Sequence, residues 1–369
     1  MNLSLTLRHL ALLPCLFLFT AGRSSAQLEL PDTRDSARVG KISVTGYPYI
    51  FYSPETEFAI GGALILTQRL GGSADEKASN VMLSGYYSVK QSYDLFLNPE
   101  LFLGDYYLTA SIDYYRYVDK FWGIGPASPD IDSASYVRNA FWTNIECDVQ
   151  VLGPLKLGLN YDLNSTTISE KRSNPYILAG DLEGSDGGLS SGFGLVLFAD
   201  TRNNSFSPSD GGFYKLSMLQ SAAWLGSDFT FARYILDARH YIGLTSNIVL
   251  ALQFYGSQIA GEPPFYMYPA LGGDNIMRGY YEGRYRDKIY LATQGEFRIR
   301  LTKRWGIVAF AGIGDVSGDY NGFKLKNVKP SFGLGVRFML DVQELLNVRA
   351  DFARGRNTEG VYFNAKEAF

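Results

Sequence analysis

The sequence predicts an all-β protein, a transmembrane antiparallel β-barrel of about sixteen strands. Three observations support this fold class. Apolar and polar residues alternate in segments along most of the chain, the pattern of strands whose two faces meet different surroundings. Tyr (26), Phe (24) and Gly (39) are abundant, yet no run beyond residue 26 approaches the ~18 apolar residues of a membrane-spanning helix. An export signal precedes the alternating segments.

The export signal occupies the start of the chain. Arg8 precedes an apolar run from Leu10 to Ala21, and Ser24-Ser25-Ala26 offers a small-residue cleavage site. An apolar run of about a dozen residues is too short to span a bilayer. We therefore expect three parts: a signal peptide at 1–26, a short N-terminal extension at 27–40 and the barrel at 41–369.

Strand alternation is clearest at 289–301. Ile289, Leu291 and Phe297 fall on one face, and Glu296 and Arg298 fall on the other. An Arg or Lys facing lipid at mid-bilayer costs about 2–4 kcal/mol, so the charged face must line the lumen. The same reasoning gives these strands: 41–52, 57–69, 80–90, 93–103, 106–118, 135–152, 155–168, 187–201, 211–224, 229–243, 247–260, 288–301, 305–316, 328–341, 346–356 and 360–369.

The connections between these strands orient the barrel. Connections after even-numbered strands are mostly short, whereas 119–134, 169–186 and 261–287, after odd-numbered strands, are long. Outer-membrane barrels have short periplasmic turns and long extracellular loops. Unpaired backbone groups in hydrocarbon cost several kcal/mol each, so the barrel must close where segment 41–52 meets 360–369. We expect the protein in the bacterial outer membrane, with the lipid bilayer as its surroundings.

One loop carries a family resemblance. Residues 271–280 read Leu-Gly-Gly-Asp-Asn-Ile-Met-Arg-Gly-Tyr, and the strand after the loop contains Glu-Phe-Arg. These motifs resemble the barrel of the BamA/TamA-like outer-membrane superfamily, also called the bacterial surface antigen family. The resemblance implies that this long extracellular loop folds back into the lumen. The residues it assigns are the loop tip Arg278, Gly279 and Tyr280, its inner-wall partner Glu296, and the backbone turn at Gly272 and Gly273.

The family usually has a second wall acid on the next strand, in an aromatic-x-Asp-x-Gly pattern. Here Phe310 to Gly314 reads Phe-Ala-Gly-Ile-Gly, so Gly312 stands in the acid's place. Asp315 is a candidate substitute, although its parity turns it to the other face.

Two further segments resemble the same superfamily. The turn containing Asp200, Arg202, Pro208 and Gly211 matches its Asp-x-Arg…Pro-x-x-Gly periplasmic turn, with an ordinary Pro/Gly turn as the alternative. The last segment resembles the terminal strand that outer-membrane assembly machinery recognises. In that segment we expect Phe363 and Phe369 to share the apolar outer face, with Glu367 near the membrane boundary.

Residues for catalysis are not apparent. The sequence has no Gly-x-Ser-x-Gly, no phosphate-cradling glycine loop and, beyond residue 26, one histidine (His240) and one cysteine (Cys147). We therefore predict no enzyme, no catalytic residues and no cofactor. Asp315, Asp319 and Asn321 form an incomplete carboxylate loop, so no metal site is predicted. A net charge of −3 gives no reason to expect nucleic acid as a partner.

The resemblance also implies a function. Members of the family insert or translocate proteins through a lateral seam between the first and last strands. Members that recruit substrates usually carry periplasmic modules, which are far longer than residues 27–40. We therefore expect a separate periplasmic partner protein, and outer-membrane protein or lipid clients. The alternative is a passive pore or structural barrel without insertase activity.

Overall fold

A computed structural model describes residues 42–68, 70, 79–131, 134–171, 174–341 and 345–369. The predicted signal peptide and the extension at 27–40 lie outside these residues. No helix within the described ranges has the length and apolar character needed to cross a bilayer.

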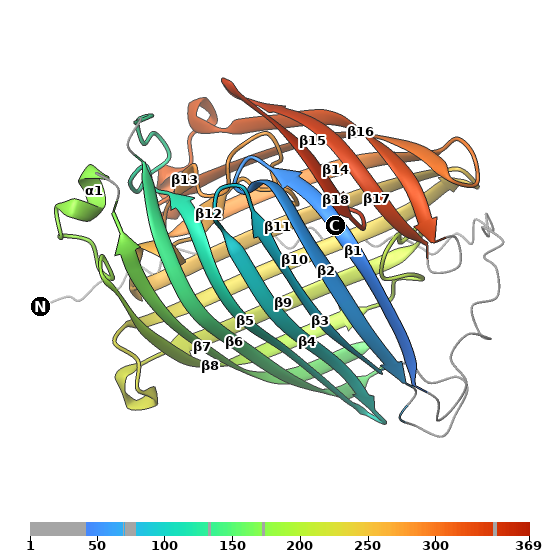
Figure 1. Cartoon of the computed structure of the whole chain (residues 1–369), viewed down its shortest axis with the longest axis horizontal. Coiled ribbons are helices and arrows are strands. Elements are labelled where there is room, and N and C mark those ends of the chain that lie inside the picture. Colours follow the sequence, from blue (N-terminus) through green and yellow to red (C-terminus); the bar gives the residue numbers. More distant parts are fainter. Residues whose placement is uncertain (1–41, 69, 71–78, 132–133, 172–173, 342–344) are drawn as a thin grey trace, which may run out of the picture.

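Sixteen strands form a closed antiparallel barrel (Figure 1), which confirms the predicted fold class. In chain order the barrel strands are β1 Ser43–Ser53, β2 Glu57–Gln68, β3 Ser79–Ser88, β4 Tyr93–Leu103, β5 Tyr106–Lys120, β6 Ser135–Leu152, β7 Leu155–Glu170, β8 Gly187–Asp200, β9 Gly211–Ser221, β10 Thr230–Thr245, β11 Ile248–Glu262, β14 Ile289–Arg300, β15 Trp305–Ser317, β16 Lys329–Asp341, β17 Leu346–Gly355 and β18 Thr358–Ala365. The small elements are α1 Pro175–Leu178, the hairpin strands β12 Ala270–Leu271 and β13 Tyr285–Arg286, and 3-10 turns at Ala223–Leu225, Phe265–Met267, Tyr320–Gly322 and Leu325–Asn327.

The strands have the two faces that their alternation predicts. On β14, Phe297 is exposed on the outer wall, whereas Glu296 and Arg298 are buried on the inner wall. Large apolar residues such as Leu195 and Leu334 are exposed on other strands in the same way. Lipid removes this outer apolar surface from water, while the charges remain inside.

The long connections gather at one end of the barrel. Figure 1 shows α1, β12 and β13 at the same end. The connections between β5 and β6, β7 and β8, and β11 and β14 share an apolar cluster there. Its members are Phe121, Tyr136, Ile168, Ile177, Phe265 and Tyr266. These packed loops cover that end of the barrel, which the predicted orientation places outside the cell.

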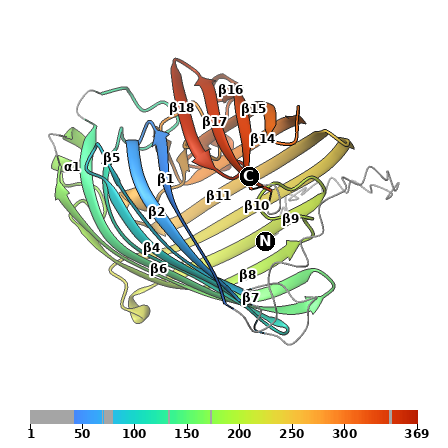
Figure 2. The same cartoon turned by 45° about the vertical axis from the view of Figure 1, so that its right-hand side comes forward.

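The junction of the first and last strands is aligned at one residue pair, Tyr52 with Phe363. By contrast, β1 and β2 pair continuously from Ser43–Thr67 to Ser53–Glu57. Figure 2 shows β1 and β18 diverging away from their point of contact. We call this junction the seam. It has the least backbone pairing in the wall, because every other neighbouring pair of strands is aligned over many residues.

Candidate functional site in the barrel lumen

The connection at 263–288, between β11 and β14, folds into the lumen. Its hairpin pairs Leu271 of β12 with Tyr285 of β13. Gly272 has a φ of 111°, and only glycine fits this position. A Cβ there would lie 2.3 Å from the Tyr281 carbonyl oxygen. The loop tip then packs on the wall through an apolar cluster. Its buried members are Leu271, Met277, Tyr280, Tyr290, Ala292 and Val316.

Arg278 projects from the tip between two carboxylates of the inner wall. Its Nη1 lies 2.6 Å from Oδ2 of Asp351, and its Nη2 contacts Oε1 of Glu296. All three side chains are fully buried. The guanidinium carbon also lies 3.6 Å from the centroid of the Phe310 ring. Charge-assisted hydrogen bonds and a cation–π contact together fix the tip in place.

The second carboxylate is Asp351 on β17, and not Asp315, the candidate substitute for the acid that the family has at the position of Gly312. A Cβ on Gly312 would lie 2.9 Å from Cβ of Gln294, so that position has little room for an acid. Asp315 instead accepts a hydrogen bond from Nζ of Lys329 at 2.6 Å. The alternation of β17 shows that Asp351 faces the lumen, but not that the loop reaches it.

The contact around Arg278 belongs to a larger set of ion pairs, which we call the lumen network. Asp351 also binds Nη1 of Arg337 at 2.5 Å and Nη1 of Arg349 at 3.1 Å. Four arginines and four carboxylates take part, so the charges of the network balance. They are Arg278, Arg298, Arg337 and Arg349 with Asp274, Glu296, Asp351 and Glu367.

The loop tip also binds the last strand of the barrel. The backbone N–H of Gly279 donates to the Tyr362 hydroxyl at 2.9 Å. Nδ2 of Asn364 donates to Oδ2 of Asp274 at 2.6 Å. Tyr362 and Asn364 lie on either side of Phe363, the residue of β18 that pairs across the seam.

A further contact joins the loop to the turn between β1 and β2. The backbone N–H of Glu282 donates to Oε1 of Glu55 at 2.8 Å. Burial raises the pKa of Glu55 above its usual value. Removal from bulk water by the surrounding loops and the nearby Glu55 carboxylate raise the pKa of Glu282 to about 7. The loop therefore contacts β18 and the turn that follows β1.

The predicted periplasmic turn lies between β8 and β9, where Asp200, Arg202 and Gly211 lie close together. Nε and Nη2 of Arg202 each donate to the Asp200 carboxylate at 2.9 Å. Pro208 is buried, and Gly211 has a φ of 91°, with only 2.1 Å between an added Cβ and the Thr201 carbonyl oxygen. These contacts stabilise the turn, and its role in function stays a prediction.

The end of the chain differs from the prediction. Phe363 is exposed on the outer face, but Phe369 does not share that face and is only 5% exposed, packed against Tyr241 and Ala251 inside the lumen. The strand ends at Ala365, and Lys366 has a φ of 66°, which breaks the alternation. Glu367 also turns inward rather than to the membrane boundary, where it binds Nε of Arg337 at 2.7 Å.

The other candidate groups have structural partners. Asp319 accepts the backbone N–H of Gly322 at 2.8 Å and so caps its own turn. Across the described ranges, no three His, Cys, Asp or Glu side chains are placed together as metal ligands.

Comparisons with known proteins agree with the barrel fold described above. The profile of the Omp85 superfamily domain matches residues 75–369. The BamA structure from Haemophilus ducreyi lacking POTRA domains 1–3 superposes with a TM-score of 0.61 at 15% identity, over 88% of this chain and 70% of that one. CdiB from Acinetobacter baumannii superposes with a TM-score of 0.59 at 13% identity, over 89% of this chain and 60% of that one. CdiB from Escherichia coli superposes with a TM-score of 0.58 at 13% identity, over 87% of this chain and 62% of that one. No curated protein matches in sequence. At these identities the structural likeness concerns the fold.

Proposed function

The chain belongs to the Omp85 superfamily, and from that membership we propose that it inserts or translocates clients through the seam between β1 and β18. It is an Omp85-type outer-membrane barrel related to BamA and CdiB. The observation that supports the proposal most is the single aligned pair at the seam, Tyr52 with Phe363. Opening the barrel wall costs the least free energy where the fewest backbone hydrogen bonds must break.

The proposed clients are outer-membrane proteins or lipids, delivered by a separate periplasmic partner protein. A packed extracellular end favours entry from the periplasm. The signal peptide at 1–26 and the extension at 27–40 belong to the same proposal, since export must place the chain in the outer membrane. The chain spans about 60% of the CdiB chains that it resembles.

Locking the seam with a disulfide is expected to abolish client assembly. Cysteines replacing Tyr52 and Phe363 would face each other, because paired residues in antiparallel strands have Cα atoms ~4.5–5.5 Å apart, within disulfide range. The background carries Cys147→Ala, because Cys147 is a free, exposed thiol. The measurement is the amount of folded outer-membrane protein in envelopes, before and after reduction.

The matched control places cysteines at Ile50 and Ile60, an exposed pair within the continuous β1–β2 ladder. This disulfide joins strands that stay together in any case, so assembly should continue. If the locked seam supports assembly as fully as the parent does, the proposed route is wrong.

The alternative function is a passive pore, and conductance separates the two. Replacing residues 262–286 by a short Gly/Ser linker removes the loop tip from the lumen, so single-channel conductance in planar bilayers should rise severalfold. Shortening the connection at 318–328, whose residues Asp319 and Leu325 are exposed, serves as the control. A parent protein that already conducts as well as the loop variant would favour the passive pore.

A further inference from the structure

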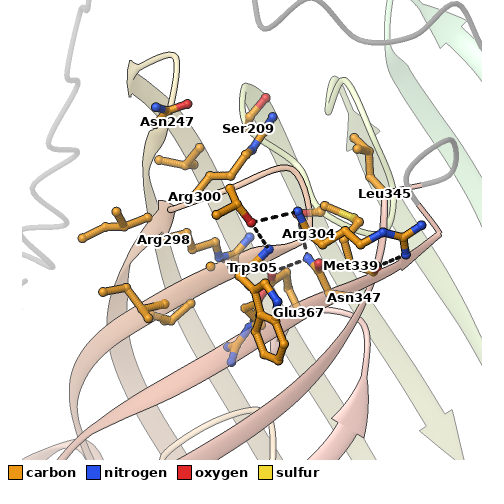
Figure 3. A pocket seen from close by; sticks show the side chains of 18 of the residues that line it. Ser209, Asn247, Arg298, Arg300, Arg304, Trp305, Met339, Leu345, Asn347 and Glu367 are labelled. Carbon is orange, nitrogen blue, oxygen red and sulfur yellow. Dashed lines mark hydrogen bonds and ion pairs between the residues drawn. The ribbon is translucent and has the colours of Figure 1, made fainter.

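A hollow of about 70 Å³ lies at the periplasmic rim of the barrel (Figure 3), and we call it the rim pocket. The turns at 207–209, 246–247 and 302–304 border it, with the ends of β14, β16 and β17. Figure 3 shows Arg298, Arg300 and Arg304 arranged around it. The pocket is separate from the loop tip, and the proposed function does not use it.

The rim pocket has an excess of positive charge. Among the described residues that line it, Glu367 is the only acid. The cationic lining residues are Arg298, Arg300, Lys303, Arg304 and Arg337. Arg298 and Arg337 pair with carboxylates of the lumen network. Arg300, Lys303 and Arg304 form no ion pair with any carboxylate in the described part of the chain, and Nη1 of Arg304 donates to the Met339 carbonyl oxygen at 3.3 Å.

Two buried donors of the lining also lack acceptors. Nη1 of Arg298 and Nη2 of Arg337 have no hydrogen-bond partner among the described residues. The two side chains are only 8% and 5% exposed. A buried donor without a partner costs about 1–3 kcal/mol, so an acceptor bound at this place would recover that cost. The excess positive charge and the donors without acceptors both favour binding of an anion in the rim pocket.

The position of the pocket indicates which anion. Trp305 borders it and is exposed, with its ring 4.9 Å from that of Phe338. Exposed aromatic residues at the end of barrel strands mark the membrane–water interface. Lipid phosphates lie at that depth, and guanidinium groups match phosphate oxygens in geometry as well as charge.

We propose that the rim pocket binds a phosphate group through Arg300, Lys303 and Arg304. The phosphate comes either from the headgroup of a phospholipid in the periplasmic leaflet or from free phosphate. Arg300 projects from the last position of β14, while Lys303 and Arg304 belong to the turn that follows, so one short segment supplies all three charges.

Binding of phosphatidylglycerol to the full chain in detergent, followed by native mass spectrometry, tests the proposal. Diacylglycerol with the same acyl chains is the phosphate-free control. Lys303 and Arg304 are exposed turn residues, so the double variant K303Q/R304Q should fold normally. We expect it to bind phosphatidylglycerol about tenfold more weakly, since charged hydrogen bonds are lost. The variant R300Q should act in the same direction.

The matched control is K324Q/K326Q, which removes two exposed charges from the extracellular connection between β15 and β16. It should bind like the parent. Competition by inorganic phosphate identifies a free-phosphate site, and retention of phosphatidylglycerol despite inorganic phosphate identifies a headgroup site. Equal binding of diacylglycerol, or unchanged binding in K303Q/R304Q, overturns the proposal.

Discussion

Replacing Arg278 with alanine is expected to destabilise the folded barrel by about 3–5 kcal/mol, the usual cost of removing one partner of a buried ion pair. Glu296 and Asp351 are fully buried and lose their shared cation. Arg298, Arg337 and Arg349 still neutralise them in part, but the space between the two carboxylates is left without a donor. Urea unfolding in detergent, followed by the heat-dependent gel shift of the folded barrel, measures the loss.

Arg284→Ala is the control for this prediction. Arg284 lies in the same loop, is partly exposed and donates to Ser128, so its loss should cost less than about 1 kcal/mol. Limited proteolysis should cut the loop of the Arg278 variant faster than that of the Arg284 variant. Equal stability and equal protease resistance in the two variants would show that the Arg278 contact does not anchor the loop.

Replacing Gly279 with alanine should be nearly as harmful, at about 2–5 kcal/mol, because strain and overlap add. Gly279 has a φ of 97°, and a Cβ there would lie 2.9 Å from backbone atoms of Arg354 and Gly355 on β17. Strand backbone cannot yield as a flexible side chain can. The tip must withdraw, and the hydrogen bond from Gly279 to Tyr362 is lost with it. The same urea unfolding assay applies.

Gly273→Ala separates strain from overlap. Gly273 has a φ of 112° in the same loop, but the nearest atoms to an added Cβ are those of Glu282 at 3.7 Å. This variant carries the backbone strain alone, about 1–2 kcal/mol. If the Gly273 and Gly279 variants lose the same stability, close packing of the tip on β17 is not what holds the loop.

The strand pattern was readable from the sequence because a barrel wall has a period of two residues and two unlike surroundings. The faces of Glu296, Phe297 and Arg298 follow from that period alone. The family motif predicts the pairing of Arg278 with Glu296. Asp351 was recognisable as a lumen residue, but its contact with Arg278 depends on how far the loop crosses the lumen, which no local pattern records.

The two-residue alternation of the strands stops at the end of the chain. A period of two residues counted from Phe363 predicts that Phe369 lies on the outer face. One residue, Lys366, adopts a left-handed conformation, and the count no longer holds beyond it. Arg298 then donates to the Phe369 carbonyl oxygen at 2.8 Å, a contact between residues far apart in the sequence.

The hydrogen bonds between the loop tip and Tyr362 and Asn364 join the plug of the lumen to the last strand of the wall. Any displacement of β18 from its place in the wall breaks them, so it also loosens the plug. Thermodynamic reciprocity then requires the converse, that withdrawing the plug eases β18 away from its neighbours by the same free energy. Permeability to small solutes and detachment of the last strand should accordingly rise and fall together.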